Sequence, residues 1–164
     1  MDNESETMLS QAYELCEDGN YSEALILYDL VIKKNPKNVR ALIDKGVTLQ
    51  NIDKFNQAIQ IYDKALKIEP KNLDALINKG SALHTCEKYA EAIACYDKAI
   101  KIDKKCTMAL AYKGLSLGEI GNLQEALQHF KKALAIDHDY DIANISKKIA
   151  QDLLKDFRKK SKTL

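Results

Sequence analysis

The sequence has no tryptophan and only two prolines and six glycines among its 164 residues. So few turn-forming residues favour helices over many short strands. No apolar run approaches the roughly 20 residues that a transmembrane helix needs, so we expect no membrane insertion. The residues after Met1 are acidic and no apolar run follows them, which argues against a secretory signal. The net charge of +1 lacks the basic excess expected of a nucleic-acid-binding domain.

Metal and cofactor motifs are also missing. No Cys-x-x-Cys occurs, the three histidines have no metal-ligand spacing, and we expect no metal site. The sequence has no glycine-rich phosphate loop, nucleophile elbow or helical metal motif, so we expect no cofactor and no enzymatic activity. The cysteines are predicted to be thiols in a reducing compartment, which indicates a cytoplasmic protein. They are Cys16, Cys86, Cys95 and Cys106.

A repeat of 34 residues organises most of the chain. Blocks that begin at Ser5, Val39, Leu73 and Thr107 align without gaps. Position 8 of each block is small, position 20 is alanine and position 24 is aromatic. These residues are Ala12, Gly46, Gly80 and Gly114; Ala24, Ala58, Ala92 and Ala126; and Tyr28, Tyr62, Tyr96 and Phe130.

The pattern of each block predicts two antiparallel helices. In the second block the apolar spacing predicts helices over 41–51 and 56–68, with a turn at Asp53-Lys54. Small residues at positions 8 and 20 let two backbones approach closely, and the ring at position 24 fills the space beside them. Pro36 and Pro70 stop the second helices of the first two blocks. Because one helix pair cannot bury its apolar face, neighbouring pairs are expected to stack.

This pattern resembles the tetratricopeptide repeat, and the resemblance covers residues 5 to about 140. It implies an all-α fold, a right-handed superhelix, and a non-catalytic scaffold for protein–protein interaction. Position 32 departs from the pattern in the last two blocks, where Lys104 and His138 replace proline and those corners are expected to be less sharply fixed. The expected parts are an N-terminal tail (1–4), four repeats (5–38, 39–72, 73–106 and 107–140) and a C-terminal capping helix (141–160).

The resemblance places the binding groove on the first helices, at positions 2, 5, 9, 12 and 13 of each block. Positions 5 and 9 form a mainly apolar stripe, which polar residues at positions 12 and 13 border. In the last block, positions 12 and 13 are Gly118 and Glu119. Such a stripe suits an apolar or amphipathic segment of another protein, unless the superhelix or the chain's own C-terminal segment closes it. The candidate groove residues are Leu9, Tyr13, Ile43, Val47, Gln50, Ile77, Ser81, His84, Ala111 and Leu115. His84 stands alone, so we expect an exposed groove residue and not a ligand.

One family ligand is excluded by these positions. Members that grip the acidic tails of heat-shock chaperones carry lysine and asparagine at positions 5 and 9 of the first repeat, asparagine at position 9 of the second, and basic residues at positions 5 and 9 of the third. This sequence instead has Leu9, Tyr13, Val47, Ile77 and Ser81 at the corresponding places. We therefore do not expect a carboxylate clamp for chaperone tails.

The C-terminal helix has its large apolar residues rotated by roughly 100° from the face that a first helix normally buries. Ile142, Ile145 and Ile149 would then extend the groove or contact a second molecule, whereas a conventional cap would bury them against the fourth repeat. Charge is also uneven, with eight acidic and no basic residues in 1–32 and seven basic against two acidic in 147–164. A self-associating structural module is thus the alternative function. Two solvated ends, or contact of the basic end with an anionic surface, are the other interpretations of this asymmetry.

Overall fold

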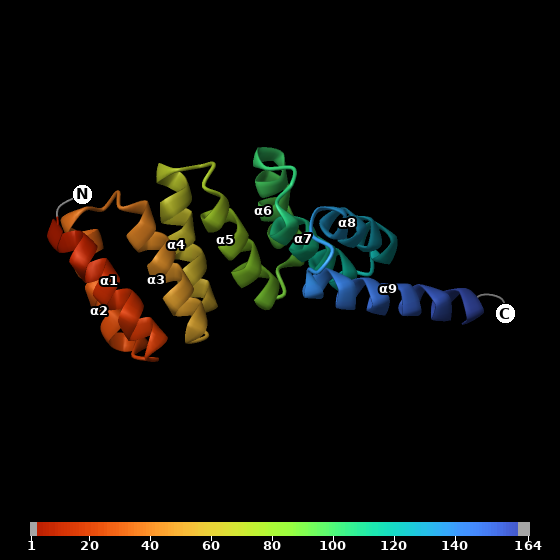
Figure 1. The fold of residues 1–164 in the computed structure, drawn as a ribbon, viewed down its shortest axis with the longest axis horizontal. Coiled ribbons are helices and arrows are strands. Elements are labelled where there is room, and N and C mark those ends of the chain that lie inside the picture. The colour runs from red at the N-terminus through yellow and green to blue at the C-terminus, as the bar shows by residue number, and fades with distance from the viewer. Residues whose placement is uncertain (1–2, 161–164) are drawn as a thin grey trace. The chain divides into compact units, whose positions relative to one another are not determined.

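A computed structural model describes residues 3–160, and within that range the chain forms nine α-helices and no strand (Figure 1). None of these helices is both long enough and apolar enough to cross a membrane. The helix bounds lie within two residues of those expected for the second block and match those of the C-terminal helix. The helices are α1 Asn3–Glu17, α2 Tyr21–Lys34, α3 Val39–Asn51, α4 Phe55–Ile68, α5 Leu73–Thr85, α6 Tyr89–Ile102, α7 Thr107–Glu119, α8 Leu123–Ile136 and α9 Asp141–Lys160.

The turns after α1, α3, α5 and α7 share one backbone conformation. Each contains a single residue with positive φ: Gly19 at 77°, Asp53 at 59°, Glu87 at 59° and Gly121 at 81°. A left-handed residue at this place closes the end of the preceding helix, because the next amide can bond back into it. In the last of these turns, the Asn122 N–H donates to the carbonyl oxygen of Leu117 at 2.9 Å. The polar breaks in the sequence were therefore correctly predicted as turns.

The corners after α2, α4, α6 and α8 are equivalent with and without proline. Pro36 and Pro70 follow α2 and α4 by two residues. After α6, the Asp103 carboxylate accepts a hydrogen bond from the Lys105 N–H at 2.9 Å, and Asp137 accepts the equivalent bond after α8 at 3.1 Å. The first corner has the same turn beside Pro36, where Asn35 Oδ1 accepts a hydrogen bond from the Lys37 N–H at 3.1 Å, so the turn does not depend on the absence of proline. All four second helices end at the same repeat position, and the expectation that the last two corners are less sharply fixed remains a prediction.

The chain divides into two compact units, residues 1–86 and residues 87–164. In the first unit, α1, α2 and α3 share one core and α3, α4 and α5 share the next. Gly46 of α3 lies so close to the Tyr62 ring of α4 that a β-carbon there would be 2.6 Å from Cζ of the ring. The boundary between the units falls within the third block, so the repeat formed by α5 and α6 remains a prediction.

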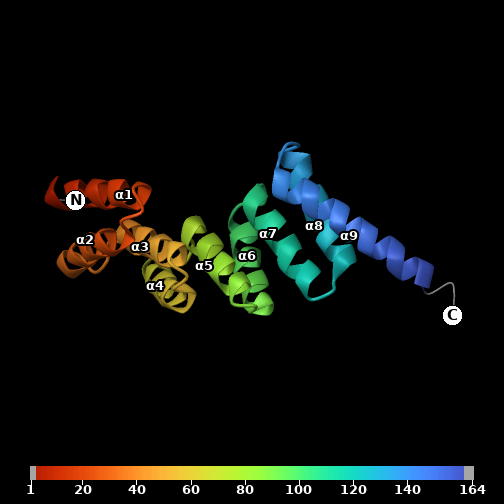
Figure 2. The same ribbon diagram turned by 90° about the horizontal axis from the view of Figure 1, so that it is seen from below.

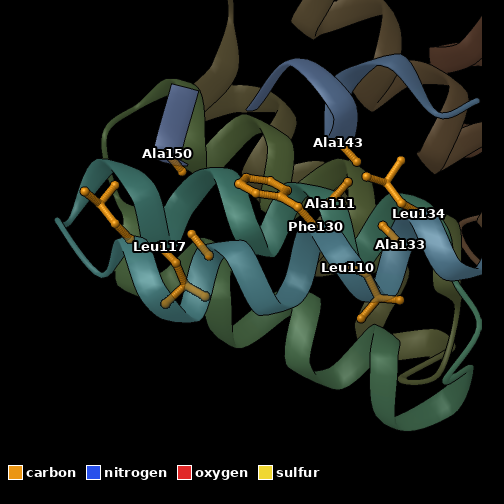
Figure 3. Packing of buried hydrophobic residues seen from close by; sticks show 10 residues of the cluster. Leu110, Ala111, Leu117, Phe130, Ala133, Leu134, Ala143 and Ala150 are labelled. Carbon is orange, nitrogen blue, oxygen red and sulfur yellow. The ribbon is translucent and has the colours of Figure 1, made fainter. Parts of the chain in front are cut away.

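In the second unit, α7 packs against α6, α8 and α9 (Figure 2). Its core joins Leu110 and Leu117 of α7 to Phe130 of α8 and to Ala143 and Ala150 of α9 (Figure 3). The ring of Phe130 lies over Gly114, where an added β-carbon would be 2.5 Å from Cε1 of the ring. The small and aromatic residues of the repeat therefore meet as the sequence predicted.

Ion pairs join α2 to α3, α4 to α5 and α6 to α7. The lysine at position 7 pairs with the aspartate at position 25 of the preceding block, and the lysine side chains are largely buried. These pairs connect consecutive repeats along the chain. They are Lys45–Asp29 at 2.5 Å, Lys79–Asp63 at 2.6 Å and Lys113–Asp97 at 2.7 Å.

Candidate functional site

Three of the candidate groove residues belong to the interior. Leu9 is 1% exposed and Ala111 is fully buried in the cores of their units, and Ile77 is also buried. The expectation that these three line an open groove is wrong. All three occupy position 5, which lies one helical turn before the small residue at position 8, on the face where helices approach most closely.

Position 9 behaves differently from position 5. Tyr13 is 62% exposed, Val47 is 37% exposed, and Leu115 is half-buried. Ile43, at position 5 of the second block, is half-buried against the core of α3 and α4. Tyr13, Val47 and Leu115 are thus accessible, as a groove requires.

The polar candidates are each partly buried. The Tyr62 hydroxyl donates a hydrogen bond to Oε1 of Gln50 at 2.5 Å, so this amide is held against the core. Burial raises the pKa of the Tyr62 phenol, and the Asp44 carboxylate raises it further. Ser81 and His84 lie half-buried on α5, and the Ser81 carbonyl accepts a hydrogen bond from the Thr85 hydroxyl. The hydrogen bond from Tyr62 holds the Gln50 amide in place, and the part of Gln50 in a groove remains a prediction.

A cleft of about 270 Å³ lies within the second unit, between α7 and α9. We refer to it as the α7–α9 cleft. Its wall and floor are mainly apolar, and the polar groups in its lining are Glu119 and Ser146. Gly114 and Gly118 form part of the α7 side. The apolar lining consists of Leu115, Leu123, Phe130, Ile149, Ala150 and Leu153.

Helix α9 presents a second apolar face beside this cleft. Ile145 is 62% exposed, Ile149 is 56% exposed, and Ile142 and Leu153 are also exposed. The helix packs on its own unit through Ala143, Ala150 and Leu154 instead. The three isoleucines are therefore not buried as they would be in a conventional cap. Their predicted part in a groove or a dimer remains a prediction, and the Phe157 side chain lies outside the described residues.

The cleft has little chemistry beyond apolar contact. Among the residues that line it, Glu119 is the one ionisable side chain. Across the part of the chain that the structure describes, no three His, Cys, Asp or Glu side chains come together to hold a metal ion. The arrangement suits the burial of apolar side chains next to a carboxylate.

Comparison with protein families decides the family of the chain. Residues 17–99 match the family model described as "Anaphase-promoting complex, cyclosome, subunit 3", and residues 87–141 match the model described as "Tetratricopeptide repeat". Together the two matches span most of the helical repeats. The chain belongs to the tetratricopeptide repeat family. No curated protein matches it.

Solved structures with the same fold include other tetratricopeptide repeat proteins. The crystal structure of MamA is 23% identical with a TM-score of 0.82, and the match covers 93% of this chain and 83% of that one. A tetratricopeptide repeat protein from Parabacteroides merdae is 21% identical with a TM-score of 0.83, covering 96% of this chain and 62% of that one. YrrB, described as "a TPR protein with an unusual peptide-binding site", is 21% identical with a TM-score of 0.74, covering 90% and 76%. At these identities the likeness shows the shared fold.

The structure adds residues of this tetratricopeptide repeat protein to the candidate site. Gly118 and Glu119 stand at positions 12 and 13 of the fourth repeat, which the sequence assigned to the groove, and both line the cleft, although neither is among the ten candidate groove residues. Leu153 also lines it, one turn beyond Ile149. A glycine inside a helix, at a position where the earlier repeats have side chains, was the available signal for this site.

Proposed function

We propose that this protein is a non-catalytic scaffold that binds an apolar or amphipathic segment of another protein in the α7–α9 cleft and on the adjoining face of α9. Ile142, Ile145, Ile149 and Leu153 form that face at intervals of three or four residues. An amphipathic helix or an extended segment with spaced apolar side chains is complementary to such a surface.

The observation that carries the proposal is the exposure of these large apolar side chains next to an apolar cleft. Single exposed leucines or isoleucines are common on protein surfaces, but four on one helical face beside a cleft form a patch. Water contact with such a patch is unfavourable, and burial against a partner would recover roughly 25 cal/mol for each Å² of apolar surface. The fold is preserved without that burial because Ala143 and Ala150 already join α9 to the core.

A non-catalytic role is supported by the composition of the cleft. Acid–base or nucleophilic catalysis needs several polar groups that converge on one point, and the lining of the cleft has a single carboxylate, Glu119. The spacing of the four cysteines, with no Cys-x-x-Cys among them, is the argument for the reducing, cytoplasmic environment that we also propose. Acidic chaperone tails are not the proposed ligand, because Leu9 and Ile77 are buried at two of the clamp positions.

The second candidate function is self-association through α9. The spacing of the exposed residues on α9 is also that of a helix that packs against another helix, and a second copy of α9 offers the same apolar face. The uneven distribution of charge between residues 1–32 and 147–164 supports this candidate as well.

Peptide binding by a double variant tests the proposal. The probe is a fluorescent amphipathic helical peptide with leucine on one face and lysine on the other, and the reference peptide has serine in place of leucine. We expect wild type to bind the leucine peptide and not the serine peptide. Ile145→Ser with Ile149→Ser should weaken binding by about tenfold or more, because two apolar contacts are lost. Stability should change by only about 0.5 kcal/mol for each exposed substitution.

The matched control is Ile26→Ser with Leu30→Ser, which removes two exposed apolar side chains at the same spacing from α2. It should leave binding unchanged. Equal weakening by both double variants would contradict binding at α9, and so would a loss of several kcal/mol of stability without a change in affinity. Sedimentation equilibrium of the same proteins tests the second candidate, which requires a dimer that only the α9 variant disrupts.

A further inference from the structure

Gly118 lies in α7 without a packing or backbone reason for being glycine. An added β-carbon at Gly118 would meet no atom within 4 Å, whereas one at Gly114, a single turn earlier, would be 2.5 Å from the Phe130 ring. Gly118 is helical, and among the described glycines positive φ occurs at Gly19 and Gly121. The fold therefore requires glycine at Gly114 but accepts a side chain at Gly118.

The space above Gly118 belongs to the α7–α9 cleft. The volume of about 270 Å³ is just below the roughly 300–1,000 Å³ of pockets that enclose small ligands, so it suits one or two side chains of a larger partner. Leu115, Ile149 and Leu153 surround this space with apolar atoms. Gly118 lines the cleft and an added β-carbon there has open space within 4 Å, so a larger side chain at this position would take up part of the cleft.

The charged side chain in the lining of the cleft is negative. Glu119 is exposed, lines the cleft, and makes no ion pair with any side chain that the structure describes. Apart from Ser146, the α9 side of the cleft is apolar and consists of Ile149, Ala150 and Leu153. A partner segment with a lysine or arginine would therefore be complementary, whereas the acidic residues 1–32 of a second copy would not.

We propose that Gly118 determines the specificity of the cleft by leaving room for one large apolar side chain of a bound peptide, and that Glu119 pairs with a lysine or arginine next to that side chain in the peptide. This inference rests on the proposed function and adds the chemistry of the partner. Leu115, Ile149 and Leu153 contact the apolar side chain, and the carboxylate at the mouth selects the sign of the neighbouring charge. Gly118 then sets the preference for a large apolar side chain, and Glu119 sets the preference for a basic residue next to it.

Peptides of defined composition test this inference. Three labelled probes share a glycine–serine host and differ at the centre: leucine flanked by lysines, alanine flanked by lysines, and leucine flanked by glutamates. We expect wild type to bind the leucine–lysine probe most tightly. Gly118→Leu should weaken that binding by about tenfold to a hundredfold and remove the preference for leucine over alanine, because the introduced side chain occupies the space. Glu119→Lys should reverse the preference between the two leucine probes.

Two controls separate occlusion of the cleft from damage to the fold. Ala135→Leu adds an exposed leucine at the penultimate position of α8, the place that Gly118 holds in α7, and should leave all affinities unchanged. The thermal midpoint of Gly118→Leu should stay close to that of wild type, since the added β-carbon meets no atom within 4 Å and the rest of the side chain enters the cleft.

The remaining outcomes overturn the inference. It is wrong if Gly118→Leu binds the leucine–lysine probe as tightly as wild type does, or if Glu119→Lys keeps the preference for lysine. Wild type that binds apolar peptides regardless of central residue and flanking charge would overturn this inference but leave the proposed function intact. If neither these probes nor the amphipathic peptide binds, both are wrong.

Discussion

At the scale of single residues, glycines one turn apart on α7 have opposite surroundings. Gly114 touches the Phe130 ring, as Gly46 touches the Tyr62 ring in the first unit. These contacts repeat because the small residue at position 8 and the aromatic residue at position 24 face each other in their blocks. Gly118 instead faces the open cleft.

Replacing Gly114 and Gly118 of α7 by alanine, one at a time, should have opposite effects on the free energy of unfolding. Gly114→Ala should lower the free energy of unfolding by about 1–3 kcal/mol, because the β-carbon would overlap the Phe130 ring. Gly118→Ala should raise it by up to about 0.5–1 kcal/mol, because alanine favours the helix and meets no obstacle. Urea unfolding measures both. Changes of the same sign would show that the α7–α8 contact is described incorrectly.

His129 should make stability depend on pH. Burial lowers the pKa of its imidazole, and Lys113 and Lys132 lower it further against an opposing effect of Glu125 and Asp97. The unfolded chain then binds a proton near the ordinary pKa of 6.5, while the folded chain resists it. This contribution to stability is therefore complete above that pKa and is lost as pH falls toward the lowered folded value.

The measurement is the thermal midpoint of wild type and His129→Gln over a range from about pH 8 to about pH 5. Wild type should lose stability on acidification, and the variant should lose less of it. Identical slopes for the two proteins would assign the pH dependence to other groups.

At the scale of helices, the lysine–aspartate pairs end before α9. Between α8 and α9, Lys131 occupies the repeat position that Asp29, Asp63 and Asp97 occupy in the earlier blocks. Lys147 occupies the position of the lysines that pair with those aspartates. Two positive charges thus stand where each earlier junction has an ion pair. The contact between α8 and α9 is consequently without this source of stability.

Lys131→Asp should extend the series of ion pairs by one junction. We expect an increase of about 0.2–1 kcal/mol in the free energy of unfolding, from a new pair between the introduced aspartate and Lys147 at the equivalent repeat positions. The control is Lys132→Asp, which changes the net charge equally at an exposed neighbouring position. Equal effects of both substitutions would mean that only the total charge matters.

The sequence predicted the helices and their cores well because both depend on local and repeating signals. Apolar spacing, the break at Asp53-Lys54 and the small residues at positions 8 and 20 all recur every 34 residues. The groove was predicted less well. Position 5 was assigned to the surface, but Leu9 and Ala111 are buried, because the rotation of one helix against its neighbours depends on packing that sequence spacing alone does not fix.

The α7–α9 cleft shows a second limit of sequence reasoning. The rotated apolar face of α9 was visible in the spacing of Ile142, Ile145 and Ile149. That Gly118 opens onto a cavity was not visible, because a glycine in a helix can also mark a close contact, as Gly114 does. Only the positions of atoms around each glycine distinguish the two.

At the scale of the whole molecule, the ends of the chain have opposite charge. Residues 1–32 contain eight acidic and no basic residues, and residues 147–164 contain seven basic and two acidic residues. If these ends join copies of the chain, association should weaken between about 0.1 M and about 1 M salt, as the screening length falls from ~10 Å to ~3 Å. Sedimentation velocity at both salt concentrations measures this. A mass that does not change with salt would leave the two ends as solvated surfaces.

The most direct measurement of binding at the α7–α9 cleft is a methyl NMR titration of the full chain with the amphipathic leucine–lysine peptide. The methyl groups of Leu115, Ile149 and Leu153 should shift together and saturate with the peptide, while those of Ile26 and Leu30 on α2 stay constant. Shifts confined to Ile26 and Leu30, or no shifts at all, would contradict a peptide-binding scaffold that acts through this cleft.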